Sequence, residues 1–148
     1  MRELTLDEVE KLIKTGIAYA LAKGYPSSVA VVDMGGNLRG ALRPEKGRIV
    51  NIPIAEKKAW TAVAFQRPTS MLNQRLGPGG TGYGIIHTDN RICIVPGGYP
   101  ILEPDGTLIG GIGASGGTAA EDQNTCLAAL KAGAFSTVFT DPMAKEVR

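Results

Sequence analysis

The stretch YPILEPDGTLIGGIGASGG, residues 99–117, decides the fold of this chain. Its two short apolar segments, 99–102 and 107–113, flank Asp105-Gly106, a dipeptide that strongly favours a tight turn between two strands. The stretch therefore predicts a β-hairpin. Because the strands of a hairpin run antiparallel, it also predicts an antiparallel sheet.

Two further segments extend this sheet. Residues 28–33 are short and rich in valine, which is typical of a buried strand, and residues 38–42 return after a turn at Gly35-Gly36-Asn37. Residues 91–95 are also short and apolar. We therefore predict five strands, of which four lie in two hairpins.

Helix signals surround the strands. Thr5 and Glu8 have the spacing of a capping box before an apolar repeat that stops near Gly24, and Thr118 and Glu121 repeat that signal before the last helix. A middle helix is predicted over residues 53–66. The order is helix, two strands, helix, three strands, helix, which indicates a single α+β domain over residues 1–148, with residues 136–148 as a tail.

Composition limits the function classes. The 148 residues suit one domain, and 16 basic against 14 acidic residues give a net charge of only +2. That charge does not favour nucleic-acid binding, and no apolar run reaches the ~20 residues of a membrane span. The acidic start favours a cytoplasmic protein without a signal peptide. Two cysteines make neither a disulfide framework nor a metal site.

Glycine is concentrated in the second half of the chain. Residues 111–116 match the dinucleotide fingerprint G-x-G-x-x-G, but only 32 residues follow Gly116 and the strands before it are joined by a hairpin. A doubly wound fold needs more strand-helix units than that, so we expect no dinucleotide cofactor. The alternative is that these glycines allow close approach to a ligand or a neighbouring subunit.

Three ionisable residues are candidates for a shared site. Lys58 falls on the apolar arc of the middle helix, Asp33 ends a buried strand, and Asp122 lies in the first turn of the last helix. A lysine on an apolar arc must reach water or a carboxylate. These residues predict either an acid–base constellation or a structural ion pair.

His87 is the only histidine, which excludes sites built on several histidines. It can be read as an axial ligand of haem iron, as a general base, or as an incidental loop residue. Tyr83 is a second candidate for iron contact. The basic residues after the first hairpin, Arg39 and Arg43 among them, form either a rim that faces an anion or a solvated edge.

Taken together, the motifs resemble the GlcG/HbpS family of haem-degrading or haem-binding domains, over residues 4–133. The branch most like this chain contains the C-terminal domain of PduO-type corrinoid adenosyltransferases. The motifs that carry the resemblance are VVDMGG at 31–36, KAWTA at 58–62, YG at 83–84, TDN at 88–90, GGYPI at 97–101, DG at 105–106, IGGIGASGG at 109–117 and EDQ at 121–123.

The resemblance implies a profilin-like layout, with an antiparallel sheet of about five strands flanked by helices. It implies a homo-oligomer, a dimer or an octamer, that binds haem or a related tetrapyrrole. One branch of the family has its haem-ligating histidine near the N-terminus. This chain has no histidine before residue 87. The residues that match the family and are expected at a pocket or interface are Asp33, Lys58, Gly98, Gly116, Gly117 and Asp122.

We therefore expect a tetrapyrrole-binding module, accessory to a diol, glycerol or glycolate type of catabolic pathway or to a cobalamin-linked one. His87 or Tyr83 would contact iron, and Arg39 or Arg43 would meet the propionates. The adenosyltransferase domain has no room in 148 residues. The alternative is a small enzyme acting on a carboxylate or hydroxy-carbonyl metabolite, with Lys58 as electrophile or acid and Asp33 or Asp122 as base. The third hypothesis is a structural subunit of an oligomer that binds no ligand.

Overall fold

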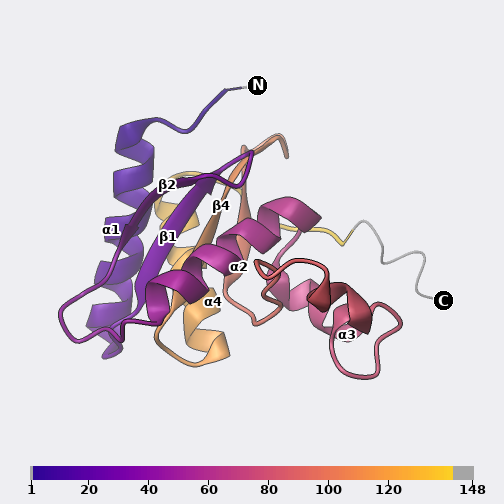
Figure 1. The fold of residues 1–148 in the computed structure, drawn as a ribbon. Coiled ribbons are helices and arrows are strands. Elements are labelled where there is room, and N and C mark those ends of the chain that lie inside the picture. Colours follow the sequence, from indigo (N-terminus) through magenta and orange to yellow (C-terminus); the bar gives the residue numbers. More distant parts are fainter. Residues whose placement is uncertain (1, 142–148) are drawn as a thin grey trace.

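A computed structural model describes residues 2–141, and it shows one sheet covered by helices on both faces (Figure 1). The α+β prediction is confirmed. In chain order the elements are α1 (Leu6–Lys23), β1 (Ser28–Asp33), β2 (Leu38–Leu42), α2 (Asn51–Phe65), η1 (Thr69–Leu72), α3 (Asn73–Leu76), η2 (Tyr83–His87), β3 (Gly98–Leu102), β4 (Leu108–Ser115) and α4 (Ala119–Ala132).

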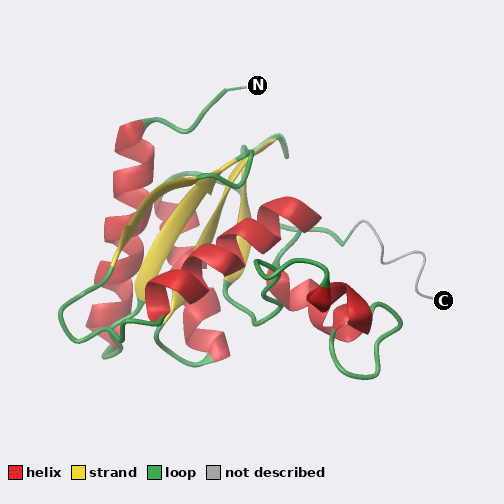
Figure 2. Ribbon diagram, in the orientation of Figure 1, coloured by secondary structure: helices red, strands yellow, loops and turns green. Residues whose placement is uncertain are grey.

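Four strands form the sheet in the order β2-β1-β4-β3, and each neighbouring pair is antiparallel. Both predicted hairpins are present, and β1 joins them by pairing with β4. The α1 and α4 helices cover one face of the sheet and α2 crosses the other (Figure 2). The sheet is thus the middle layer of three.

The strand predicted over residues 91–95 is wrong, because this segment is irregular. Several of its backbone polar groups bond to side chains instead of to a neighbouring strand. The Cys93 N–H donates to Thr61 Oγ1 at 2.9 Å, and the Val95 carbonyl accepts from Thr69 Oγ1 at 2.8 Å. The segment therefore lies along α2 and η1, outside the sheet.

The predicted capping boxes open α1 and α4. Thr5 Oγ1 accepts from the Glu8 N–H at 3.1 Å, and Thr118 Oγ1 accepts from the Glu121 N–H at 3.2 Å. Gly24 ends α1 with φ 96°, a left-handed conformation that suits glycine. The middle helix begins at Asn51, two residues before the predicted start.

Glycines on β4 allow the backbone of α2 to lie directly on the sheet. A Cβ at Gly111 would stand 2.6 Å from the Ala59 carbonyl oxygen, and one at Gly113 would overlap the Ala55 carbonyl oxygen. Part of the fingerprint-like stretch therefore serves contact between a helix and a strand of the same chain.

The described part of the predicted tail packs back on the fold. The Ser136 N–H donates to the Leu102 carbonyl at 2.9 Å, and the Phe139 ring lies 5.1 Å from the Tyr99 ring. Residues 142–148 of the predicted tail lie outside the described residues. Within residues 2–141, no helix is long and apolar enough to cross a membrane, and the cytoplasmic location stays a prediction.

Candidate functional site

Lys58 and Asp122 meet at the end of the sheet, where β4 leads into α4. Lys58 Nζ lies 3.0 Å from Asp122 Oδ2 and donates to the Ala114 carbonyl at 2.9 Å. The Gly117 N–H donates to Asp122 Oδ1 at 3.0 Å. The two side chains are only 1% and 5% exposed. The pair therefore joins α2 to α4 inside the protein.

This centre has the properties of a structural ion pair. Burial raises the pKa of Asp122, and the Lys58 ammonium and the Gly117 N–H act against that rise. Burial also raises the pKa of the neighbouring Cys126 thiol, whose Sγ lies 3.3 Å from the Gly97 carbonyl oxygen. Both charges of the pair have partners inside the protein, which favours the structural reading over the acid–base one.

The glycines matched to the family surround this pair. A Cβ at Gly98 would overlap the Lys58 carbonyl oxygen, so β3 runs against α2 without a side chain between them. Gly116 has φ 146°, and a Cβ there would stand 2.6 Å from Ser27 Cα. With the Gly117 N–H on Asp122, these glycines shape the junction between sheet and helices.

The expectation that Asp33 joins Lys58 and Asp122 is wrong. Asp33 pairs with Gly110, whereas Ala114, the residue beside Lys58, pairs with Val29. Four residues of strand separate these positions, which is about 13 Å. A fixed distance along a strand keeps Asp33 away from the buried pair.

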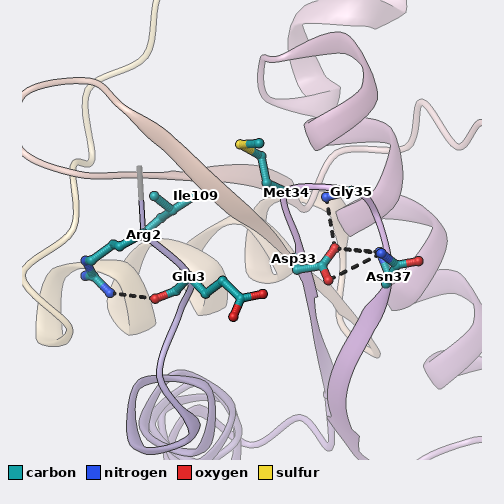
Figure 3. A pocket seen from close by; sticks show the side chains of 7 residues that line it. All are labelled: Arg2, Glu3, Asp33, Met34, Gly35, Asn37 and Ile109. Atoms are coloured by element: carbon teal, nitrogen blue, oxygen red, sulfur yellow. Dashed lines mark hydrogen bonds between the residues drawn. The ribbon is translucent and has the colours of Figure 1, made fainter.

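Asp33 instead holds the turn between β1 and β2. Its Oδ1 accepts the Gly35 N–H and the Asn37 N–H, each at 2.9 Å. Figure 3 shows Asp33 bonded to Gly35 and to the Asn37 side chain at one side of a cavity, whose volume is 310 Å³. Arg2 and Glu3 of the N-terminal segment lie across that cavity from the turn (Figure 3). The role of Asp33 is thus to shape the β1–β2 turn, residues 33–37.

A second cavity lies on the other side of the same turn, between it and α2. Its volume is 390 Å³, within the range of small-molecule sites. We call it the Trp60 groove, and its lining residues are Gly36, Asn37, Leu38, Pro53, Glu56, Lys57, Trp60 and Arg91. It combines an apolar wall with both signs of charge.

Arg91 is fixed against the wall of the Trp60 groove. Its guanidinium carbon lies 4.1 Å from the centre of the Trp60 ring, a cation–π contact. Asp89 binds Arg91 Nη2 at 2.7 Å and Nε at 3.0 Å. The Arg91 guanidinium lowers the pKa of Asp89 to about 2, so this carboxylate stays ionised near neutral pH.

His87 and Tyr83 lie together on η2 at the surface. Their rings meet edge to face with centroids 5.9 Å apart, and both side chains are exposed. Ile85 between them is 41% exposed. The structure thus places the two predicted iron ligands side by side on one open face.

The predicted propionate partners are engaged elsewhere. Arg39 Nη1 donates to the Leu4 carbonyl at 2.9 Å, and Arg43 Nη1 donates to the Gly47 carbonyl at 2.8 Å. Each ties the β2 strand or its following loop to nearby backbone. Neither lines the Trp60 groove.

Sequence reasoning missed Lys57, Trp60 and Arg91 as site residues. Trp60 is the only tryptophan, and it lies in KAWTA, one of the motifs that carry the family resemblance. Lys57 falls outside the apolar arc of the middle helix, and that position by itself does not indicate a binding site. Arg91 gave no usable signal, because its place depends on how residues 88–97 fold back on α2.

Comparisons with known proteins place this chain among described relatives. A family model for haem degrading protein HbpS-like matches residues 4–131. The corrinoid adenosyltransferase PduO of Salmonella typhimurium is 33% identical over 134 residues, which cover 88% of this chain and 40% of that protein. A 15.0 kDa protein from the dhaT–dhaS intergenic region of Citrobacter freundii is 33% identical, over 81% of this chain and 84% of that protein. This chain therefore spans about two-fifths of the length of PduO.

Solved structures of similar proteins have the same fold as this chain. The crystal structure of a PduOC:heme complex superposes with a TM-score of 0.86 at 31% identity, covering 92% of this chain and 99% of that one. The Streptomyces reticuli HbpS double mutant gives a TM-score of 0.81 at 28% identity, covering 89% and 88%. The chain belongs to the family described as haem degrading protein HbpS-like.

Proposed function

We propose that this chain is a haem-binding module. The observation that carries the proposal is the likeness to the PduOC:heme complex, which extends over 92% of this chain with a TM-score of 0.86. In this proposal the protein binds the tetrapyrrole, and no adenosyltransferase activity is attributed to it.

His87 supports the proposal as the axial ligand. Imidazole is a common ligand of haem iron, and the His87 side chain is exposed, with its ring edge to face against the Tyr83 ring. Exposed Tyr83 and Ile85 give the same face apolar area for a macrocycle. Tyr83 is the second candidate for iron contact.

We also propose that the chain works as a homo-oligomer. Within residues 2–141, none of the cavities described above is lined by His87. A haem ligated there would have one side covered by this chain and the other open. A second copy of the chain would cover that side and remove the macrocycle from water.

The proposed pathway is the catabolism of diols or glycerol, or a cobalamin-linked route. Support comes from the relatives, one of which is a corrinoid adenosyltransferase and another is encoded between dhaT and dhaS. The module would then act beside an enzyme of such a pathway.

Absorption titration with haem tests the proposal. We expect a saturable Soret shift at a fixed ratio of haem to protein, and we expect His87→Ala to abolish or alter its spectrum. Thr88→Ala, next in the chain, is the matched control and should leave the spectrum unchanged. A saturable shift that survives in His87→Ala would keep haem binding and assign the ligand to another residue. Uptake without saturation would contradict the proposal.

A further inference from the structure

We propose that the Trp60 groove binds an organic carboxylate. In this proposal Lys57 and Arg91 bind the carboxylate group. Trp60, Leu38 and Pro53 contact the apolar body of the ligand. The inference concerns a cavity whose lining residues do not include His87 or Tyr83.

Unpaired hydrogen-bond donors are the first argument. A guanidinium has five N–H donors, and Asp89 uses those of Arg91 Nε and one of Nη2. Within residues 2–141, Nη1 of Arg91 and Nζ of Lys57 donate to no protein acceptor. The free edge of the guanidinium can therefore bind a second carboxylate with two parallel bonds.

The rigidity of the groove is the second argument. A Cβ at Gly36 would stand 2.6 Å from Trp60 Cδ1, so the β1–β2 turn rests directly against the indole. Asp33 fixes that turn through Gly35 and Asn37, and Asp89 fixes Arg91. A ligand would find the walls already in place and would lose little affinity to their ordering.

The remaining polar groups define the ligand further. Glu56 also lines the groove, and its carboxylate would repel a second acid group placed beside it. Asn37 lines the wall formed by the β1–β2 turn; because its Nδ2 donates to Asp33, its Oδ1 is the atom that can accept a bond from a ligand hydroxyl. The groove is therefore suited to one carboxylate at one end of a largely apolar molecule.

Two classes of ligand have such a carboxylate next to an apolar body. One is a free small carboxylic acid. The other is a propionate of a tetrapyrrole, and this second source rests on the function proposed above. Both predict the same dependence on Lys57 and Arg91.

The fluorescence of Trp60 gives a direct test, because it is the only tryptophan in the chain. Hexanoate and hexanol are the first probes, since they share an apolar body and differ in charge. Iron-free protoporphyrin IX, followed by its absorption, is the second probe and cannot form an axial iron bond. The variants are Lys57→Gln and Arg91→Gln, with exposed Lys46→Gln as the matched control.

A saturable response to hexanoate, absent with hexanol and weakened about tenfold in both groove variants, would support the proposal with a free acid as ligand. If hexanoate acts no differently from hexanol, a fall of about tenfold in protoporphyrin affinity in the same variants would support the propionate source. The proposal is overturned if neither probe distinguishes Lys57→Gln from Lys46→Gln. Lys57 has no protein partner among the described residues, so this variant decides the matter even if Arg91→Gln fails to fold. Haem titration can still succeed or fail separately.

Discussion

Lys57 and Lys58 are consecutive on α2 and have opposite surroundings. Lys58 is buried, 3.0 Å from Asp122, and bonded to the Ala114 carbonyl. Lys57 is exposed and lines the Trp60 groove with no protein partner among the described residues. A helix turns about 100° per residue, so neighbours in sequence face different layers. The buried ammonium holds the fold together, and the exposed one keeps its donors free for a ligand.

Two carboxylates repeat this contrast. Burial raises the pKa of Asp122, whereas the guanidinium of Arg91 lowers the pKa of the half-buried Asp89 to about 2. The first acid is held inside although desolvation disfavours its charge. The second is stabilised as an anion at the surface, where it orients a binding residue.

Removing the buried ammonium should have the largest effect on stability. Lys58→Met leaves Asp122 buried without its partner, and we expect it to lower the free energy of unfolding by about 4 kcal/mol in urea titrations. Lys57→Met is the matched control and should change it by less than about 0.5 kcal/mol. Equal losses of unfolding free energy in the two variants would show that the two lysines do not differ in their contribution to stability.

Adding one methyl group under α2 should come next. Gly113→Ala places a Cβ against the Ala55 carbonyl, and we expect a loss of about 3 kcal/mol because helix and strand must separate. Gly84 has open space around its Cβ position, so Gly84→Ala serves as the control in the same thermal or urea unfolding experiment. Similar stability of both variants would show that α2 does not depend on this contact.

Asp33→Ala should affect the β1–β2 turn and the Trp60 groove beside it. Losing the bonds to Gly35 and Asn37 should cost about 1 kcal/mol and loosen the turn beside Trp60, which shifts the tryptophan emission to the red. Asp105 caps the other hairpin turn through the Thr107 N–H at 3.0 Å. Asp105→Ala should therefore cost a similar amount and leave the emission unchanged. An identical emission shift in both variants would remove the assigned role of Asp33.

The smallest effect should be a pH dependence at Asp89. Its folded pKa of about 2 lies below the ordinary value near 3.8, so its contribution is present above pH 3.8 and is lost as the pH falls through about 2. The difference in unfolding midpoint between the wild-type protein and Asp89→Asn should shrink over this window. A difference that grows as the pH falls would reverse the sign argued here.

Much of the fold followed from local signals. Turn dipeptides located both hairpins, and capping boxes at Thr5 and Thr118 located two helix starts. Helical periodicity placed Lys58 on the apolar arc of its helix, where it had to reach water or a carboxylate, and Asp122 was one of its two expected partners. Residues 91–95 were misread because side chains of α2 and η1 satisfy their backbone, and no local pattern reveals such partners.

The candidate site was less predictable for the same reason. Asp33 lies at the far end of β1 from the buried pair. The sequence indicates which strands pair, but it does not indicate where along those strands a helix will lie. Arg91 reaches Trp60 across 31 residues of chain, through the short helices η1, α3 and η2 and the loops that join them. Contacts that depend on the path of such a segment carry no period in the sequence.

Thermal unfolding with and without haem tests the central claim most directly. A ligand that binds only the folded protein raises Tm in proportion to the logarithm of its free concentration above Kd. We predict that Tm of the wild-type chain rises steadily with haem concentration, and that the rise is smaller in His87→Ala. A Tm that stays constant or falls as haem is added would contradict a haem-binding function, because haem would then associate without preference for the folded state.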